Sequence, residues 1–194
     1  MISEESRLNL AHQNLRSVPK TLINSFQTRV KIIDLSNNNI DDVSFLRSFS
    51  SLTCIILDHN DIGSDTVFPY LPNVTIVWLN YNNVHTISEF AKRLASSFPN
   101  VQQLSLMGNP GVPHCREETF YDYLRYRLYV ISCFNRLQYL DDRPVTDHER
   151  QEAVRLFGSP LLEKLSLITD TFVGAVSKLR QYITSPQSHR PNVI

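Results

Sequence analysis

The sequence has no net charge, few glycines and no long apolar run, and each shortage excludes a class of protein. Nineteen basic residues balance 19 acidic ones over 194 positions, so we expect no direct nucleic-acid or acidic-membrane binding. No run of about 18 uncharged apolar residues is present to form a transmembrane helix. The first ten residues lack the basic start and apolar core of a signal peptide, which favours a cytoplasmic location.

Catalytic and metal-binding patterns are also missing. The 5 glycines form no phosphate-binding loop, and we expect no enzyme activity and no cofactor. Cys54, Cys115 and Cys133 make an odd number without paired spacing, which favours free thiols in a reducing compartment. His114 and Cys115 are adjacent but have no partners at zinc-ligand spacing, so we expect no metal site. We interpret them as a loop residue beside a small buried thiol.

An eleven-residue pattern recurs at a constant offset. It reads "VKIIDLSNNNI" at 30–40, "LTCIILDHNDI" at 52–62 and "VTIVWLNYNNV" at 74–84, with apolar residues at positions 1, 4, 6 and 11 and Asn at position 9. This is the leucine-rich repeat signature. A fourth unit at 101–111 keeps positions 1 to 9, and residues 6–15 form a degenerate first turn.

The repeated residue types predict a stacked solenoid, because one repeat cannot bury its own apolar face. We expect the position 6 leucines to point into a shared core, namely Leu35, Leu57, Leu79 and Leu106. We expect the position 9 asparagines to form a buried ladder that satisfies backbone groups at each turn. These asparagines are Asn38, Asn60, Asn82 and Asn109.

The predicted fold is α/β: a leucine-rich repeat solenoid with a short curved parallel sheet on its concave side, a helical C-terminal cap and an extra C-terminal helix. We assign an N-terminal degenerate repeat or cap to 1–29, repeats to 30–115, the C-terminal cap to 116–158, an amphipathic helix to 160–184 and a disordered tail to 185–194.

Local patterns place the helices. "SEFAKRLASSFPN" predicts a helix with Ser88 as its N-cap, and "TDHE" at 146–149 predicts a capping box. "YDYLRYRLY" places tyrosines among basic residues, which leaves open an RNA-stacking surface beside the favoured cap helix. "NRLQYLDD" predicts one more turn after the fourth repeat.

The C-terminal helix carries an apolar stripe at helical spacing. Its members are Leu161, Leu165, Ile168, Phe172, Val176, Leu179 and Ile183. The stripe fits either a lid or cap extension, or a helix that binds a second partner.

The candidate site lies on the concave sheet face, because residues alternate sides along a strand. If positions 4 and 6 face the core, positions 3 and 5 face outward, and the middle of that face is largely apolar. Large exposed apolar patches mark interaction sites, and tryptophan and tyrosine are enriched at binding hot spots. The predicted partner-binding residues are Ile32, Asp34, Cys54, Ile56, Asp58, His59, Ile76, Trp78, Asn80, Tyr81, Ser105 and Met107. The alternative is that residues 161–183 fold back and bury Trp78 within the chain.

Repeats and cap together resemble the phosphatase-regulator (SDS22-like) type of leucine-rich repeat protein. Within that type, "DLSNNNI", "IILDHNDIGSD", "YLPN", "SLMGNP", "YRLYVI" and "VTDHER" resemble the melanocyte differentiation-associated group. The cap resemblance rests on Tyr126, Arg127, Val130, Leu137, Leu140, Asp141, Val145, Thr146, Glu149 and Arg150. The likeness covers about residues 30 to 152, and the chain after 152 departs from that group.

This resemblance implies a non-enzymatic adaptor in endosomal and melanosome-related trafficking. It implies that the repeats bind a Rab-type small GTPase and that the C-terminal part recruits a second complex, which would bring the protein to endosome-related membranes. By itself we expect the chain to be a monomer. The alternatives are a splicing ribonucleoprotein scaffold, whose concave face holds a helix of an RNA-binding partner, and a phosphatase regulator.

Overall fold

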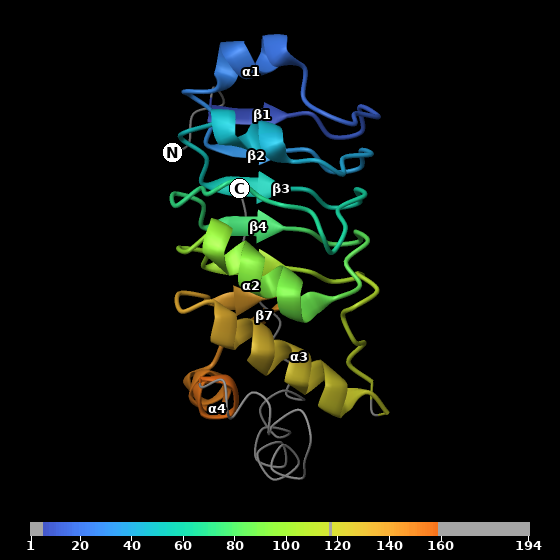
Figure 1. Cartoon of the computed structure of the whole chain (residues 1–194), viewed down its shortest axis with the longest axis vertical. Helices are drawn as coiled ribbons and strands as arrows, with labels where there is room; N and C mark the ends of the chain where they lie inside the picture. The colour runs from blue at the N-terminus through green and yellow to red at the C-terminus, as the bar shows by residue number, and fades with distance from the viewer. Residues whose placement is uncertain (1–5, 117, 159–194) are drawn as a thin grey trace.

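The computed structural model describes residues 6–116 and 118–158, and within them one seven-stranded sheet runs in chain order from β1 to β7. The strands are β1 (Arg7–Asn9), β2 (Ile32–Asp34), β3 (Cys54–Ile56), β4 (Ile76–Trp78), β5 (Gln103–Ser105), β6 (Tyr139–Leu140) and β7 (Arg143–Pro144). Neighbouring strands are parallel from β1 to β6, and they stack along the long axis of the molecule (Figure 1). The predicted repeat solenoid is confirmed.

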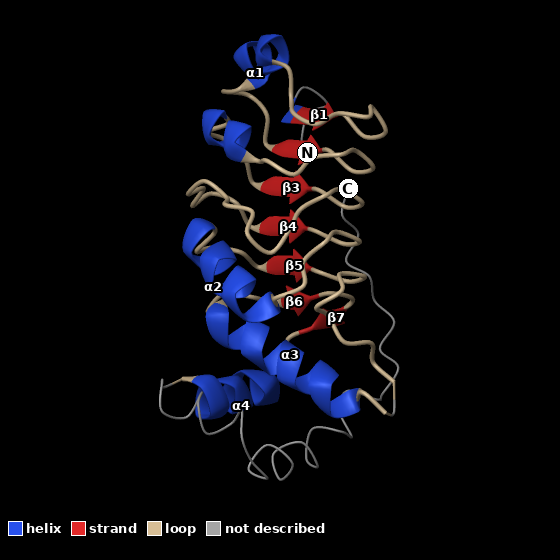
Figure 2. Ribbon diagram, turned by 45° about the vertical axis from the view of Figure 1, so that its right-hand side comes forward, coloured by secondary structure: helices blue, strands red, loops and turns tan. Residues whose placement is uncertain are grey.

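Helices occupy the return paths of most turns, but the path between β3 and β4 contains none. The helices are α1 (Lys20–Phe26), the 3-10 helix η2 (Ser44–Ser48), α2 (Ile87–Ser97), α3 (Phe120–Cys133) and α4 (Asp147–Phe157). Helices α2 and α3 lie along one side of the sheet, and α4 closes the end beyond β7 (Figure 2). The antiparallel strand β7, which pairs with β6, was not predicted from the sequence.

The start of α2 differs from the prediction. Thr86, not Ser88, is the N-cap residue, and the helix begins at Ile87. The Ser64 hydroxyl accepts hydrogen bonds from the amides of His85 and Thr86, at 2.9 Å each. Ser64, in the neighbouring turn, thus provides the acceptor for the two amides just ahead of the helix. The helix starts two residues earlier than it would with Ser88 as its N-cap.

The core lies on one face of the sheet. Position 4 residues pair in register across the strands, as Ile33 with Ile55, Ile55 with Val77 and Val77 with Leu104. All of them are buried, as are the position 6 leucines, each of which is fully inaccessible. The alternation expected for strands therefore places even positions inside and odd positions on the opposite face, which we call the concave face.

The predicted asparagine ladder is confirmed, and each member links two turns. Asn60 donates from Nδ2 to the carbonyls of Leu35 (2.9 Å) and Leu57 (3.1 Å), and its Oδ1 accepts from the amide of Ile40 (3.0 Å). Asn82 repeats this arrangement one turn later, accepting from the Ile62 amide at 3.0 Å. Buried backbone groups that the short strands leave unpaired therefore find partners in these amides.

A left-handed residue precedes every ladder asparagine. Position 8 is occupied by Asn37, His59, Tyr81 and Gly108, with φ of 55°, 54°, 54° and 74°. This conformation is uncommon for residues with a Cβ, yet three of the four positions here carry one. The ladder asparagine that follows holds the turn in place.

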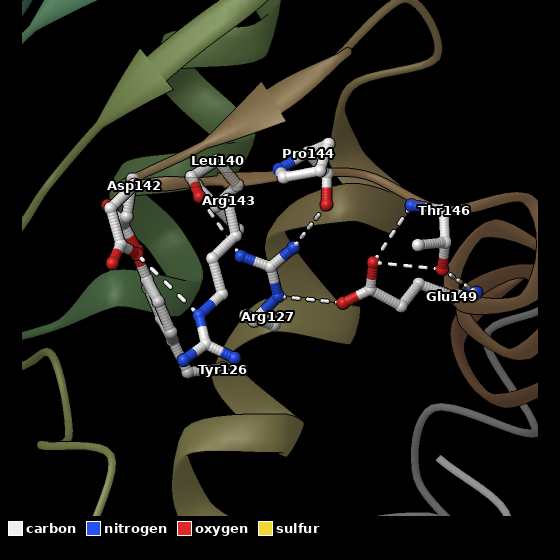
Figure 3. A network of polar contacts seen from close by, with 9 residues as sticks. Tyr126, Arg127, Leu140, Asp142, Arg143, Pro144, Thr146 and Glu149 are labelled. Carbon is white, nitrogen blue, oxygen red and sulfur yellow. Dashed lines mark hydrogen bonds and ion pairs between the residues drawn. The ribbon is translucent and has the colours of Figure 1, made fainter. Parts of the chain in front are cut away.

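The C-terminal cap is tied together by one buried arginine (Figure 3). Arg127 of α3 is 1% exposed, pairs with Glu149 of α4 at 2.8 Å, and donates to the carbonyls of Leu140 (3.0 Å) and Pro144 (3.2 Å). The other Glu149 oxygen accepts from the backbone and hydroxyl of Thr146, so the predicted capping box is confirmed. One side chain thus joins α3, the β6–β7 hairpin and α4.

Two of the four tyrosines of α3 face inward, whereas Tyr121 is 46% exposed and Tyr129 is partly exposed. Tyr123 and Tyr126 are each 6% exposed, and the Tyr126 hydroxyl donates to Asp141 at 2.9 Å. The other Asp141 oxygen accepts from the amide of Leu106, which links the cap to the fourth repeat. This burial supports the cap-helix interpretation of "YDYLRYRLY" over an RNA-stacking surface. The predicted helix at 160–184 and tail at 185–194 lie outside the described residues.

Substituting Asn60 by alanine tests the ladder. The change leaves buried backbone groups on two turns without partners, and each such group costs about 1–3 kcal/mol. We expect the free energy of unfolding, measured by urea denaturation, to fall by about 3 kcal/mol. Asn73→Ala is the matched control, because Asn73 is exposed and should change stability by less than about 0.5 kcal/mol. Equal losses in the two variants would contradict a structural ladder.

Candidate functional site

The concave face carries an apolar cluster that is separate from the core. Its buried members are Ile32, Cys54 and Ile56, and Ile76 and Trp78 pack against them. The register pairs Ile56 with Trp78 and Trp78 with Ser105. Trp78 therefore points away from the core that its neighbours Val77 and Leu79 fill, as the repeat register predicts.

Burial divides the twelve predicted partner-binding residues into two groups of equal size. Six are buried and offer little contact area: Ile32, Asp34, Cys54, Ile56, Asn80 and Ser105. Six are partly or fully accessible: Asp58, His59, Ile76, Trp78, Tyr81 and Met107. The expectation of a broad exposed apolar patch is wrong, because the central residues of the apolar cluster pack against one another and are only 2% to 7% exposed.

The buried polar residues hold the strand ends in place. The Asn80 Oδ1 accepts from the Ser105 hydroxyl at 2.6 Å and from the Met107 amide at 2.9 Å. Asp58 in turn accepts from the Asn80 amide at 2.8 Å. Asn80 and Ser105 therefore position the edge of the concave face, and the accessible residues around them carry the contact surface.

An aromatic stack forms the carboxyl edge of this face. The rings of His59 and Tyr81 are nearly parallel, at 8°, with their centroids 4.4 Å apart. Tyr81 is 56% exposed. A Cβ at Gly108 would lie 2.4 Å from the Tyr81 ring, so the glycine leaves room for that ring. This stack was not predicted from the sequence, although His59 and Tyr81 both occupy position 8 of neighbouring repeats.

A pocket of about 250 Å³ opens beside Trp78. Arg7, Asp34, Asp58 and His59 contribute its polar lining, and Ile56 and Trp78 are among its apolar walls. Arg7 pairs with Asp34 at 3.1 Å. The predicted set of partner-binding residues did not include Arg7. Arg7 occupies position 3 of the degenerate first repeat and lies in register with Ile32, which could have identified it.

Two groups on the concave face have shifted pKa values. Burial raises the pKa of the Cys54 thiol to about 12, so this thiol is protonated and unreactive at neutral pH. Burial also raises the pKa of Asp58, and the hydrogen bond from the Asn80 amide opposes that rise. A raised pKa means that the isolated protein stabilises the charged form of this carboxylate poorly.

The remaining chemistry is sparse. Within residues 6–116 and 118–158, no three His, Cys, Asp or Glu side chains are grouped so that they could hold a metal ion. None of the three cysteines, all within the described residues, forms a disulfide, and Cys115 is exposed, so the interpretation of Cys115 as a buried thiol is wrong. No helix in the described part of the chain is long and apolar enough to cross a membrane.

Comparison with known proteins identifies relatives along most of the chain. The leucine-rich repeat family model matches residues 20–169. The human leucine-rich melanocyte differentiation-associated protein is 36% identical over 130 residues, which are 64% of this chain and 66% of the human protein. The U2 small nuclear ribonucleoprotein A' of Candida albicans is 27% identical over 183 residues, covering 93% of this chain and 73% of the relative.

A solved structure shares the fold. A chain in the crystal structure of the Drosophila melanogaster SNF/U2A' complex superposes with a TM-score of 0.62, covering 82% of this chain and 85% of that one. At 23% sequence identity, this likeness concerns the fold alone.

Thiol labelling tests the concave-face burial. With Ellman's reagent on the native protein at neutral pH, we expect Cys115 to react fastest and Cys54 to react only after unfolding, because Cys54 is buried and protonated. Cys115→Ser should remove the fast phase and Cys54→Ser should leave it unchanged. Loss of the fast phase in Cys54→Ser would contradict the packing of the apolar cluster.

Proposed function

This chain belongs to the leucine-rich repeat family, and from that premise we propose that it is a non-enzymatic adaptor whose concave face binds a folded protein partner. Repeat solenoids present extended surfaces of this kind for partner binding. The contact surface is the accessible set on the concave face and at the carboxyl ends of its strands. Its members are Asp58, His59, Ile76, Trp78, Tyr81 and Met107.

The observation that carries this proposal is the orientation of Trp78. Its side chain leaves the core and is partly exposed beside a pocket, three residues before the exposed Tyr81 of the same repeat. Tryptophan and tyrosine dominate binding energy at protein interfaces because they bury large areas with few rotatable bonds. Trp78 packs against the concave-face cluster and is absent from the core that Val77 and Leu79 fill.

A Rab-type small GTPase is the partner we propose first. The support is the resemblance to the melanocyte differentiation-associated group and the 36% identity to its human member. Because the chain spans only 66% of that protein's length, the partners of the relative are only proposed for this chain. On this proposal the protein is cytoplasmic, a monomer by itself, and recruited to endosome-related membranes through its partners.

A ribonucleoprotein scaffold is the second candidate. The support is the match to a U2 small nuclear ribonucleoprotein A' along 93% of the chain, together with the fold shared with a chain of the SNF/U2A' complex. On this proposal the concave face holds a helix of an RNA-binding protein and does not contact RNA directly. The absence of net charge agrees with indirect contact.

A direct binding comparison separates the two candidates. The chain is titrated with a Rab-type GTPase loaded with a non-hydrolysable GTP analogue, with the same GTPase loaded with GDP, and with an RNA-recognition-motif protein from a splicing particle. Saturable binding of the GTP-loaded GTPase supports the first candidate. Binding of the RNA-recognition-motif protein alone contradicts it and supports the second, and binding of neither overturns both.

Substituting Trp78 by alanine tests the surface itself. We expect the affinity for the partner to fall by about 2 kcal/mol or more, roughly thirtyfold, while the repeats stay folded. Tyr70→Ala is the matched control, because Tyr70 is an exposed aromatic outside the concave face and should leave affinity unchanged. Lower thermal stability with unchanged affinity in Trp78→Ala would show that the indole has a structural role.

Truncation tests the proposed second partner site, the C-terminal apolar stripe. The stripe residues are Leu161, Leu165, Ile168, Phe172, Val176, Leu179 and Ile183, all outside the described residues. A chain that ends at Gly158 keeps the whole Arg127–Glu149 network. We therefore expect its melting temperature to stay within about 3 °C of the full chain, while any second complex is lost. Unfolding of the truncated repeats would show that the stripe is part of the cap.

A further inference from the structure

The pocket beside Trp78 has an uneven charge. Arg7 neutralises Asp34, at 3.1 Å, and Asp34 also accepts from the Ser36 hydroxyl at 2.8 Å. Asp58 accepts from the amide of Asn80, and none of the ion pairs among the described residues involves it. The lining therefore holds two carboxylates, of Asp34 and Asp58, and one guanidinium, of Arg7, which is already paired with Asp34.

We propose that this pocket receives one arginine side chain from the protein partner, with its guanidinium against Asp58 and over the indole of Trp78. The proposal rests on the concave face being the partner-binding surface, and it names the chemistry of the partner at that surface.

The size of the pocket favours a single side chain. At about 250 Å³ it is smaller than the roughly 300–1,000 Å³ typical of pockets for cofactors and drug-sized molecules. It nevertheless exceeds, several times over, the roughly 30 Å³ that one water molecule occupies in the liquid. One long side chain on a protein partner therefore fits this volume better than a free cofactor.

The lining of the pocket favours arginine over an apolar side chain. Ile56 and Trp78 supply an apolar wall that accepts the methylene stem and the flat face of a guanidinium, and tryptophan is the best cation–π partner. Asp58 supplies the opposite charge. Its pKa is raised by burial, and a neighbouring cation would favour its charged form.

Arginine also fits better than lysine. A guanidinium is planar and weakly hydrated, so it loses less solvation when it stacks on an indole, whereas an ammonium is compact and strongly hydrated. The exposed residues His59, Tyr81 and Met107 border the strand ends around the pocket. They would contact the partner surface that carries the arginine.

The test uses a small probe, so it does not depend on knowing the partner. The chain has 1 tryptophan, so indole fluorescence and the indole N–H resonance both report on Trp78 alone. The full chain is titrated with N-acetyl-arginine methylamide, with the lysine analogue, and with the citrulline analogue, which has nearly the same shape and no charge. Asp58→Asn removes the carboxylate, and Asp61→Asn removes an exposed charge outside the pocket lining as the matched control.

We expect a saturable shift of the indole resonance with the arginine analogue, a weaker effect with lysine and none with citrulline. Asp58→Asn should weaken arginine binding by about fivefold, and Asp61→Asn should leave it unchanged. Arg7→Ala should strengthen it, because Asp34 then loses its cation. Equal shifts with arginine and citrulline, or an unchanged affinity in Asp58→Asn, would overturn the proposal.

The outcome is separable from that of the proposed function. If Trp78→Ala abolishes partner binding while Asp58→Asn affects neither the arginine analogue nor the partner, the surface stands and the arginine pocket is rejected. If the pocket binds arginine specifically but neither Trp78→Ala nor Asp58→Asn changes partner affinity, the pocket chemistry stands and the partner binds elsewhere.

Discussion

Four successive turns of this solenoid depend on a buried asparagine whose amide bonds to two turns at once. Asn60 satisfies carbonyls of two successive repeats and an amide of the earlier one. Strands of three residues make too few ladder bonds to define a register by themselves, so the asparagines fix how one repeat lies on the next. That register sends Val77 into the core and Trp78 out of it.

The same turn also shapes the binding edge. The left-handed residue before each asparagine carries its side chain at the strand end, which is where His59 and Tyr81 stack. Gly108 ends the row because its Cβ would collide with the Tyr81 ring. At the far end, the buried pair of Arg127 and Glu149 closes the solenoid, and the bonds of Arg127 to the Leu140 and Pro144 carbonyls offset part of the cost of burying two charges. Structural and binding roles therefore fall to different residues of the same repeat.

Sequence periodicity was sufficient for the parts that repeat. Leucines and asparagines at constant spacing predicted the fold, the ladder and the outward direction of Trp78, because each follows from strand alternation. Periodicity could not predict how deeply Ile32 and Ile56 are buried, since exposure depends on packing between strands. It also missed Arg7 in the degenerate first turn, the β7 strand in the cap and the true N-cap of α2. Each of these three features depends on a contact that is not repeated from turn to turn, so a periodic pattern does not reveal it.

The central claim is that the Trp78 side chain stands on the concave face and is covered by a protein partner. Acrylamide quenching of its fluorescence tests this directly, because the chain has no other tryptophan. The account predicts intermediate quenching in the isolated chain, and several-fold slower quenching when the partner is present at saturation. The same quenching rate with and without the bound partner would contradict it.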